Sequence, residues 1–407
     1  MDSNDKSILR ELAAQVAAAA ATGEMERKRD LWRRHNSLQR TPVLTYIFAF
    51  PGDVGGREGV PKEILRCATP FLRELEFALR LELFRASLGD DQIIEPWLTI
   101  RPVYKDTGFG VAPVVERSKD GKSIHYLPAL AKGASLDHLT LPSHTLDEEA
   151  SRIRWETAEE AFGDLLEVDR YRAPYCTINR KGGDLGHMLG FDKLLLDMVD
   201  CPEWMHALLR ILCSGYRKVQ DEALAAGDFS LTAGDSQTMC YSLELPDPRP
   251  NTFGVGLNQL WGFMSSQEMA GVSPEMTDEF SFQYDIPLME PFGLTAYGCC
   301  EDLTRKIPYL KKIRNLRRIS VTPWADVGRC AEQIGQDYIL SWRPNPSSHV
   351  SREWDPALIR REIREGMKMA QGCHFDITLK DVLTVQGELW RLPAWVDIVR
   401  EVGAEFA

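Results

Sequence analysis

The sequence predicts an α/β fold built around a parallel sheet. The prediction rests on the alternation of strand and helix patterns and on the chain length. The β-rich run over residues 316–321 is followed by a helical pattern over 326–334, and the runs over 338–342 and 375–379 are again followed by helical patterns. Strands that alternate with helices pair in parallel. A chain of 407 residues with 44% hydrophobic content permits two ordinary domains or one elaborated α/β barrel.

Composition excludes several classes of protein. A formal charge of -12 argues against a protein that follows nucleic-acid phosphates, because such proteins carry a basic face. The apolar stretch over 12–21 is mostly alanine, so we expect no signal peptide and no membrane span. The nine irregularly spaced cysteines do not resemble a disulfide framework. We therefore expect a soluble, cytoplasmic protein whose cysteines are mostly reduced and buried.

The first third of the chain is the least regular part. Residues 1–41 predict a helical arm, first alanine-rich and then strongly charged, which we expect to be exposed or to make an oligomer contact. The remaining residues, 42–407, are expected to form one domain. Its first strand, over 43–50, ends at Pro51, which cannot donate to a sheet ladder. A second strand is predicted over 97–103, within a loop-rich or cap region that spans about 54–146.

Regular signals begin at about residue 155. A strand is predicted over 173–178, followed by a loop that contains His187. Pro202 suits the first turn of a long helix that Gly227 ends. A strand over 229–233 then carries Asp235 to its far end. Later helices begin with similar signals at Ser273-Pro274 and Asp355-Pro356.

Two adjacent cysteines, Cys299 and Cys300, follow Tyr297-Gly298 where a strand is predicted to end and a helix to begin. A thiolate at a helix N-terminus is stabilised by the helix dipole, so this pair suits a nucleophile or a metal ligand. The alternative is that both are small residues packed under a loop. In that alternative Glu301, next in the chain, serves only to stabilise the start of the helix electrostatically.

Several segments occur in the order and spacing of a known family. They are 189–216 with Asp197 and the run Asp200-Cys-Pro-Glu-Trp204, then Ser273-Pro274-Glu275, Tyr297-Gly298-Cys299, 319–321 with Asp326, and Pro393 in the last helix. Over roughly residues 150–405 the chain resembles the uroporphyrinogen decarboxylase superfamily. That resemblance implies a TIM-like (β/α)8 barrel with its active site at the carboxyl ends of the strands.

The resemblance is stronger to one branch of that superfamily. True uroporphyrinogen decarboxylases carry an arginine-rich signature after the first strand, where this chain has the run from Phe48 to Asp53 and no arginine pair. The other branch contains zinc-dependent methyltransferases that serve corrinoid proteins or thiol acceptors, and its metal-binding strand ends in His-x-Cys. Here Tyr297-Gly298-Cys299 keeps the cysteine and replaces the histidine.

The resemblance implies a zinc site whose ligand set departs from the family pattern. The second family cysteine, after the last strand, has no counterpart in residues 378–384. Cys373 precedes that strand, so we expect it at the opposite mouth of the barrel. Zinc takes Cys, His and carboxylate ligands, and the candidates are Cys299, Cys300, Glu268 and Asp381.

Further candidates lie after predicted strands, each with a structural alternative. Asp235 is a possible acid or base or a turn carboxylate; Arg343 and Lys380 are possible anion-binding or catalytic groups or surface ion-pair partners. Gln237, His187 and Trp324 are candidate substrate-binding residues, and Trp324 suits an aromatic wall or ordinary rim packing.

These observations favour a methyltransferase that moves a methyl group between a methylated small molecule or corrinoid and a second acceptor through a metal-thiolate site. A corrinoid protein as partner and a homodimer follow only from the resemblance. One alternative is a metal-independent decarboxylase or lyase, in which Arg343 or Lys380 binds a carboxylate and Asp235 handles a proton. Another is a barrel that binds a tetrapyrrole or corrinoid without turnover.

Overall fold

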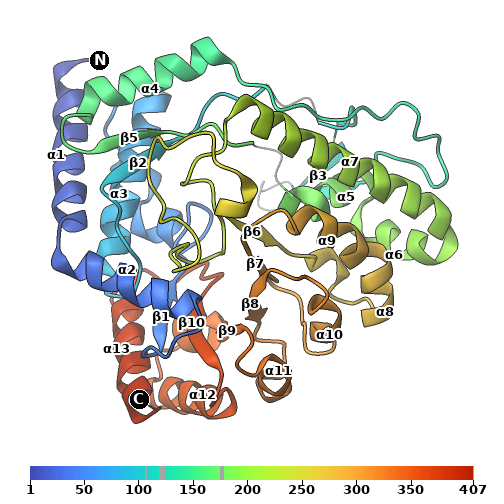
Figure 1. Cartoon of the computed structure of the whole chain (residues 1–407). Coiled ribbons are helices and arrows are strands. Elements are labelled where there is room, and N and C mark those ends of the chain that lie inside the picture. Colours follow the sequence, from blue (N-terminus) through green and yellow to red (C-terminus); the bar gives the residue numbers. More distant parts are fainter. Residues whose placement is uncertain (106–107, 113, 119–123, 175–177, 407) are drawn as a thin grey trace.

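A curled parallel sheet of six strands forms the centre of the chain in the computed structural model, which describes residues 1–105, 108–112, 114–118, 124–174 and 178–406 (Figure 1). The spatial order is β1-β10-β9-β8-β7-β6, and every neighbouring pair is parallel. The strands are β1 (Leu44–Ile47), β6 (Trp261–Met264), β7 (Leu294–Tyr297), β8 (Leu316–Val321), β9 (Ile339–Trp342) and β10 (His374–Leu379). The predicted α/β class is confirmed.

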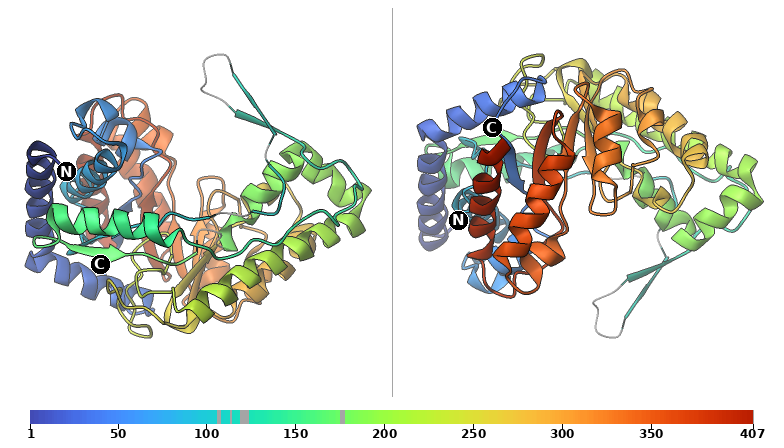
Figure 2. Two further views of the ribbon diagram at one scale, coloured as in Figure 1. Left: turned by 90° about the horizontal axis from the view of Figure 1, so that it is seen from above. Right: turned by 90° about the horizontal axis from the view of Figure 1, so that it is seen from below.

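The eight strands of a closed barrel are not present as one sheet in the described residues. β2 (Trp97–Ile100) and β5 (Glu167–Arg170) form a separate parallel pair. β3 (Val114–Arg117) and β4 (Ile124–Leu127) form an antiparallel pair that extends away from the rest of the chain (Figure 2). The structure is therefore a half-barrel of TIM-like type with β additions.

Side chains rather than a neighbouring strand occupy the outer edge of β1. The Thr45 amide donates to the Asp91 carboxylate at 2.8 Å, and the Ile47 amide donates to Asp90 at 2.7 Å. The Asp91 amide returns a hydrogen bond to the Thr45 carbonyl at 2.8 Å. The buried edge thereby has its polar groups satisfied without strand pairing.

Helices cover the outer face of the sheet, as βαβ connections require. The contacts include α9 on β6, α11 on β9 and α13 on β1. The helices are α1 (Ser3–Ala20), α2 (Gly23–Asn36), α3 (Pro70–Ser87), α4 (Glu148–Phe162), α5 (Lys181–Leu189), α6 (Phe191–Asp200), α7 (Pro202–Ala226), α8 (Pro274–Thr277), α9 (Gln283–Met289), α10 (Ile307–Leu310), α11 (Val327–Ile334), α12 (Pro356–Met369) and α13 (Arg391–Gly403). Gly366 of α12 packs on Trp342 of β9, where an added Cβ would lie 2.4 Å from the indole.

The predicted N-terminal arm is helical, and one face of it is buried. α1 packs against α3 and α4, and Leu9, Ala13 and Val16 have no exposed surface. They share an apolar core with Trp32 of α2 and with residues of β2 and β5. The apolar side chains on one face of this alanine-rich helix therefore pack against the rest of the same chain.

Two of the predicted strands were wrong. Residues 229–233 form no strand and contribute only an isolated bridge from Ser230 to Phe253. Residues 173 and 174 are also not in a strand, Ile178 begins a 3₁₀ turn, and 175–177 lie outside the described residues. The region 54–146, predicted to be loop-rich or a cap, contains the 18-residue helix α3 as well as β2, β3 and β4. Short apolar runs fit strands, loops and helix starts equally well.

A buried ion pair lies inside the amino-terminal end of the sheet. Arg318 of β8 and Asp376 of β10 meet at 2.8 Å, and both side chains are almost fully buried. His35 of α2 lies 2.9 Å from the same Asp376 oxygen, and Asn36 Oδ1 accepts from Arg318 at 3.0 Å. α2 therefore closes this end of the sheet with polar contacts.

No helix in the described part of the chain combines the length and apolar character that a bilayer crossing requires.

We predict that Asp376→Asn destabilises the fold by about 3–5 kcal/mol, because it leaves the buried Arg318 guanidinium without its counter-charge. Urea denaturation followed by circular dichroism measures the loss. Glu405→Gln is the control, since it removes the exposed Arg364–Glu405 pair and should change the midpoint little. Equal midpoints for the two variants would contradict a structural role for the buried pair.

The destabilisation caused by Asp376→Asn should depend on pH. Burial alone raises the pKa of Asp376, but the charge of Arg318 and the hydrogen bonds from His35 and Ser341 outweigh it and lower the pKa from 3.8 to about 2. The stabilisation is therefore complete above pH 3.8 and is lost as the pH falls toward 2. The difference between wild type and Asp376→Asn should shrink over that interval.

Candidate functional site

The candidate site lies at the carboxyl ends of the strands, where β7, β9 and β10 deliver Cys299, Arg343 and Lys380. Gly298 turns the chain after β7 with φ of +99°. A Cβ at Gly298 would lie 2.6 Å from Leu303 Cδ1, so a larger residue cannot take this conformation without displacing its neighbours. This glycine sets the direction in which Cys299 leaves the strand.

Cys299 is surrounded by hydrogen-bond donors. The Lys380 ammonium donates to Cys299 Sγ at 2.6 Å, and the Gln237 amide nitrogen lies 3.7 Å from it. Cys300 Sγ lies 3.6 Å from Cys299 Sγ and 3.5 Å from an Asp381 carboxylate oxygen. The Cys300 thiol and the Lys380 ammonium favour a negative charge on the Cys299 sulfur.

The two cysteines therefore titrate very differently. The hydrogen bond with Cys300 has the largest effect on the pKa of Cys299; burial opposes it, and the charges of Lys380 and Arg343 reinforce it, lowering the pKa from 9.0 to about 5. The hydrogen bond with Cys299 and then burial raise the pKa of Cys300. The pair loses its first proton at Cys299 and is a thiolate–thiol pair at neutral pH.

Arg343 joins two segments of the site. Its Nη1 donates to the Cys299 carbonyl at 2.6 Å, and its Nη2 donates to Gln237 Oε1 at 2.6 Å. Gln237 has φ of +58° and Asp381 has φ of +59°, a conformation that costs energy for residues other than glycine. Such backbone strain is typical of functional sites.

Glu301 fixes the backbone around the thiolate. One carboxylate oxygen accepts from the Cys299 amide at 2.9 Å, and the other accepts from the Ser266 amide, after β6, also at 2.9 Å. The side chain is only 1% exposed. Glu301 thus joins the ends of β6 and β7, although the sequence pattern suggested that it begins a helix.

The predicted helix after Cys300 is absent. Residues 298–302 are irregular, and the next helix, α10, begins at Ile307. The stabilisation of the thiolate therefore comes from Cys300, Lys380 and Arg343 and not from a helix dipole.

A cavity of about 390 Å³ opens above the thiolate. Its lining includes Cys299, Cys300 and Lys380, and Trp324 stands at its wall with 72% of its surface exposed. The ammonium of Lys380 also lies 5.6 Å from the centre of the Phe48 ring. Phe48 was missed as a site residue, because an aromatic residue in an apolar run carries no signal beyond core packing.

Asp235 connects to this site through Gln237. Its carboxylate accepts from the Gln237 amide at 2.9 Å, the local turn bond that the structural alternative expected. The carboxyl is accessible, yet surrounding protein displaces enough water to raise its pKa. Asp235 therefore shapes the loop that carries Gln237 and also suits proton transfer.

His187 and Glu268 lie elsewhere. His187 is on α5 rather than in a loop, and its ring lies against Tyr126 of β4 with centroids 4.4 Å apart. Glu268 packs against Gly182 of α5, where an added Cβ would lie 2.3 Å from a carboxylate oxygen. Burial raises the pKa of Glu268 to about 7.

The four candidate zinc ligands are not assembled as one cluster. Among the described residues no group of three or more His, Cys, Asp or Glu side chains is arranged to hold a metal ion. A catalytic zinc needs about three protein ligands, whereas the Cys299 sulfur is in contact with the Lys380 ammonium. In this arrangement the residues do not fit a zinc site, and binding of zinc stays a prediction from the resemblance.

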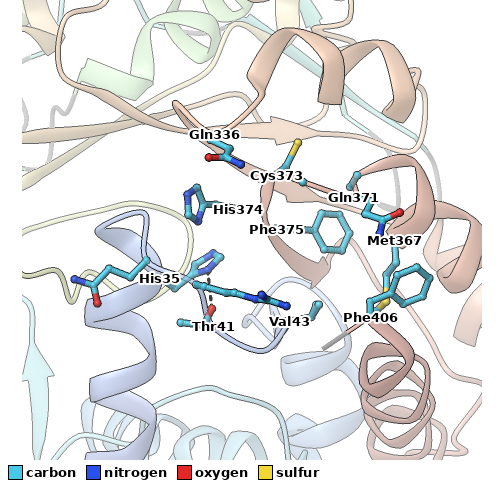
Figure 3. A pocket seen from close by; sticks show the side chains of 14 residues that line it. His35, Thr41, Val43, Gln336, Met367, Gln371, Cys373, His374, Phe375 and Phe406 are labelled. Atoms are coloured by element: carbon cyan, nitrogen blue, oxygen red, sulfur yellow. Dashed lines mark hydrogen bonds between the residues drawn. The ribbon is translucent and has the colours of Figure 1, made fainter.

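Cys373 lies at the opposite end of the sheet, as expected. It precedes β10 and lines a separate cavity of about 490 Å³ with His35 and Thr41 from the N-terminal segment and Phe406 from the C-terminal one (Figure 3). It is not part of the Cys299 site.

Comparisons with known proteins give the fold. No protein-family model matches the chain, and no curated protein matches it. Among solved structures, a methyltransferase from Methanosarcina mazei is similar with a TM-score of 0.54 at 11% sequence identity, over 92% of this chain and 98% of that chain. At that identity the likeness shows a shared fold, and what this chain does must be argued from its site.

We predict that alkylation of Cys299 by iodoacetamide follows a thiolate with a pKa of about 5 and that Lys380→Met moves this midpoint to higher pH. The neutral side chain removes the charge and the hydrogen bond that favour the thiolate. Peptide mass spectrometry across a pH series measures the rate at each cysteine. Cys201, whose pKa is raised chiefly by burial, is the internal control, and an unchanged Cys299 profile in the variant would contradict the assigned role of Lys380.

Proposed function

We propose that the protein is a methyltransferase of the uroporphyrinogen decarboxylase superfamily in which the Cys299 thiolate takes a methyl group from a methylated small molecule. The observation that carries the proposal is the thiolate itself, held against Lys380 at 2.6 Å and facing a cavity of about 390 Å³. The fold shared with a protein named a methyltransferase supports it. A soft, polarisable thiolate is a strong nucleophile toward a methyl carbon.

The residues around Cys299 suit the two ends of such a displacement. A sulfur lone pair forms the new S–C bond, and the bond between the methyl carbon and its heteroatom breaks, leaving the electron pair on the heteroatom. Lys380 donates a proton to that heteroatom. The product then leaves as a neutral alcohol or amine instead of as an anion. Arg343 and Glu301 hold the carbonyl and the amide of Cys299, so the nucleophile keeps its direction.

The methylated Cys299 sulfur must then release its methyl group to a second acceptor. A thioether releases methyl only to a very strong nucleophile, so the second acceptor belongs to that class. A corrinoid protein, which the sequence resemblance implies, is one such partner. Because the candidate ligands do not form a zinc site in this arrangement, no step of the proposal uses a metal.

A second candidate is the metal-independent decarboxylase. It is favoured by Asp235, whose pKa is raised because surrounding protein displaces water, an effect that outweighs the lowering of the pKa by the charge of Lys380. A substrate carboxylate would leave as carbon dioxide, and Asp235 would donate its proton to the carbanion that remains. In this reaction Cys299 has no covalent role.

Labelled methyl donors distinguish the candidates. We predict that incubation with a methyl-labelled aryl ether, quaternary ammonium compound or methylated corrinoid places one methyl group on the peptide that contains Cys299. Cys299→Ser should abolish the labelling. Lys380→Met should slow labelling by the aryl ether, whose oxygen needs a proton as it leaves, by about 10²–10⁴-fold, the usual contribution of a general acid.

Cys373→Ser is the matched control, because it changes a thiol at the other end of the sheet and should leave labelling intact. Labelling of other cysteines, or of none, would refute the proposal. If Cys299→Ser instead decarboxylates a carboxylated compound and Asp235→Asn does not, the decarboxylase becomes the better account.

A further inference from the structure

The outer part of the Cys299 cavity has an unusual wall. The segments after β8 and β9 contribute Pro323, Pro344 and Pro346 to its lining. Proline has no backbone N–H and little freedom to move. These three positions are therefore rigid and lack a backbone donor, whereas Asn345, Ser347 and Ser348 of the segment after β9 add polar side chains to the lining. The wall suits a rigid ligand that combines an apolar body with a polar group.

Trp324 stands on the same wall with most of its side chain exposed. Its 72% exposure is the highest among the large apolar side chains of the residues described, and no aromatic ring lies against it in that part of the structure. A tryptophan buries a large area when it is covered, and its face prefers another flat ring. Its exposure is accounted for if a planar ligand covers it.

Arg352 is the unpaired cation of this cavity. It lines the cavity, its side chain is exposed, and in the described ranges it has no carboxylate partner. Lys380 and Arg343 are already engaged with Cys299. Asp381 lies 4.0 Å from Lys380, so an anionic group on a ligand is repelled from that side and attracted to Arg352, whose guanidinium suits a carboxylate.

We propose that Arg352 and Trp324 determine specificity for a substrate with a flat ring and an anionic group, the ring lying on Trp324 and the anion on Arg352. The methyl group of that substrate then faces Cys299, a part of the inference that rests on the proposed function. A cavity of about 390 Å³ is within the usual size of small-molecule sites and is much larger than a one-carbon substrate needs.

Binding can be tested without the reaction. Full-length Cys299→Ser protein is titrated calorimetrically with benzoate, with benzyl alcohol as the neutral ring and with cyclohexanecarboxylate as the anion without a flat ring. Because a hydrogen-bonded charge adds substantially to binding, benzoate should bind about tenfold more tightly than benzyl alcohol. It should also bind more tightly than cyclohexanecarboxylate.

Variants made in the same background assign the two residues. Arg352→Gln should remove the preference for benzoate over benzyl alcohol, and Arg352→Lys should restore part of it. Trp324→Leu should remove the preference over cyclohexanecarboxylate. Arg329→Gln, an exposed arginine on α11 that pairs with Asp326, should change neither preference.

Failure of the two proposals is distinguishable. Absence of benzoate binding at millimolar concentration, or an unchanged preference in Arg352→Gln, would overturn this inference even if Cys299 accepts methyl groups. Binding with the expected preferences, but no labelling of Cys299 in the wild type, would leave the specificity site standing and refute the methyl transfer.

Discussion

The buried pair of Arg318 and Asp376 is the constraint on which the rest of the structure depends. A charged pair out of contact with water is stable only when its remaining hydrogen-bonding groups are also satisfied. Ser341 donates to Asp376 at 2.8 Å, and α2 supplies His35 and Asn36 from the other side. The pair therefore fixes β8, β9 and β10 relative to each other and explains why the N-terminal helices belong to the same body as the sheet.

The same alternation that buries this pair also places the lysine of the candidate site. Residues two apart on a strand share one face, so Asp376 and Thr378 of β10 and Lys380, directly after the strand, follow one another along the interior. One end of that column carries a structural ion pair, and the other carries the ammonium that contacts the Cys299 sulfur. Stability and chemistry are separated along a single strand, as they are in barrels generally.

The sequence allowed the α/β class, the last three strands and the helix over 202–226 to be predicted, because periodicity, proline starts and glycine ends are local signals. It also indicated Cys299, Cys300, Arg343 and Lys380, since each follows a strand. The incomplete closure of the sheet depends on contacts between distant segments, such as Asp91 with Thr45. The roles of Glu301 and Arg352 were likewise missed, because a single charged residue in a loop has no periodicity to reveal it.

The carboxylates along the outer edge of β1 have a consequence for association. An exposed strand edge can recruit a strand from another molecule, which is a common route to aggregation. Here Asp90 and Asp91 already accept the amides of Ile47 and Thr45, so the backbone donors that an incoming strand would use are taken. The β1 edge of the half-barrel is in this way protected from pairing with a strand of another molecule, without an additional strand to cover it.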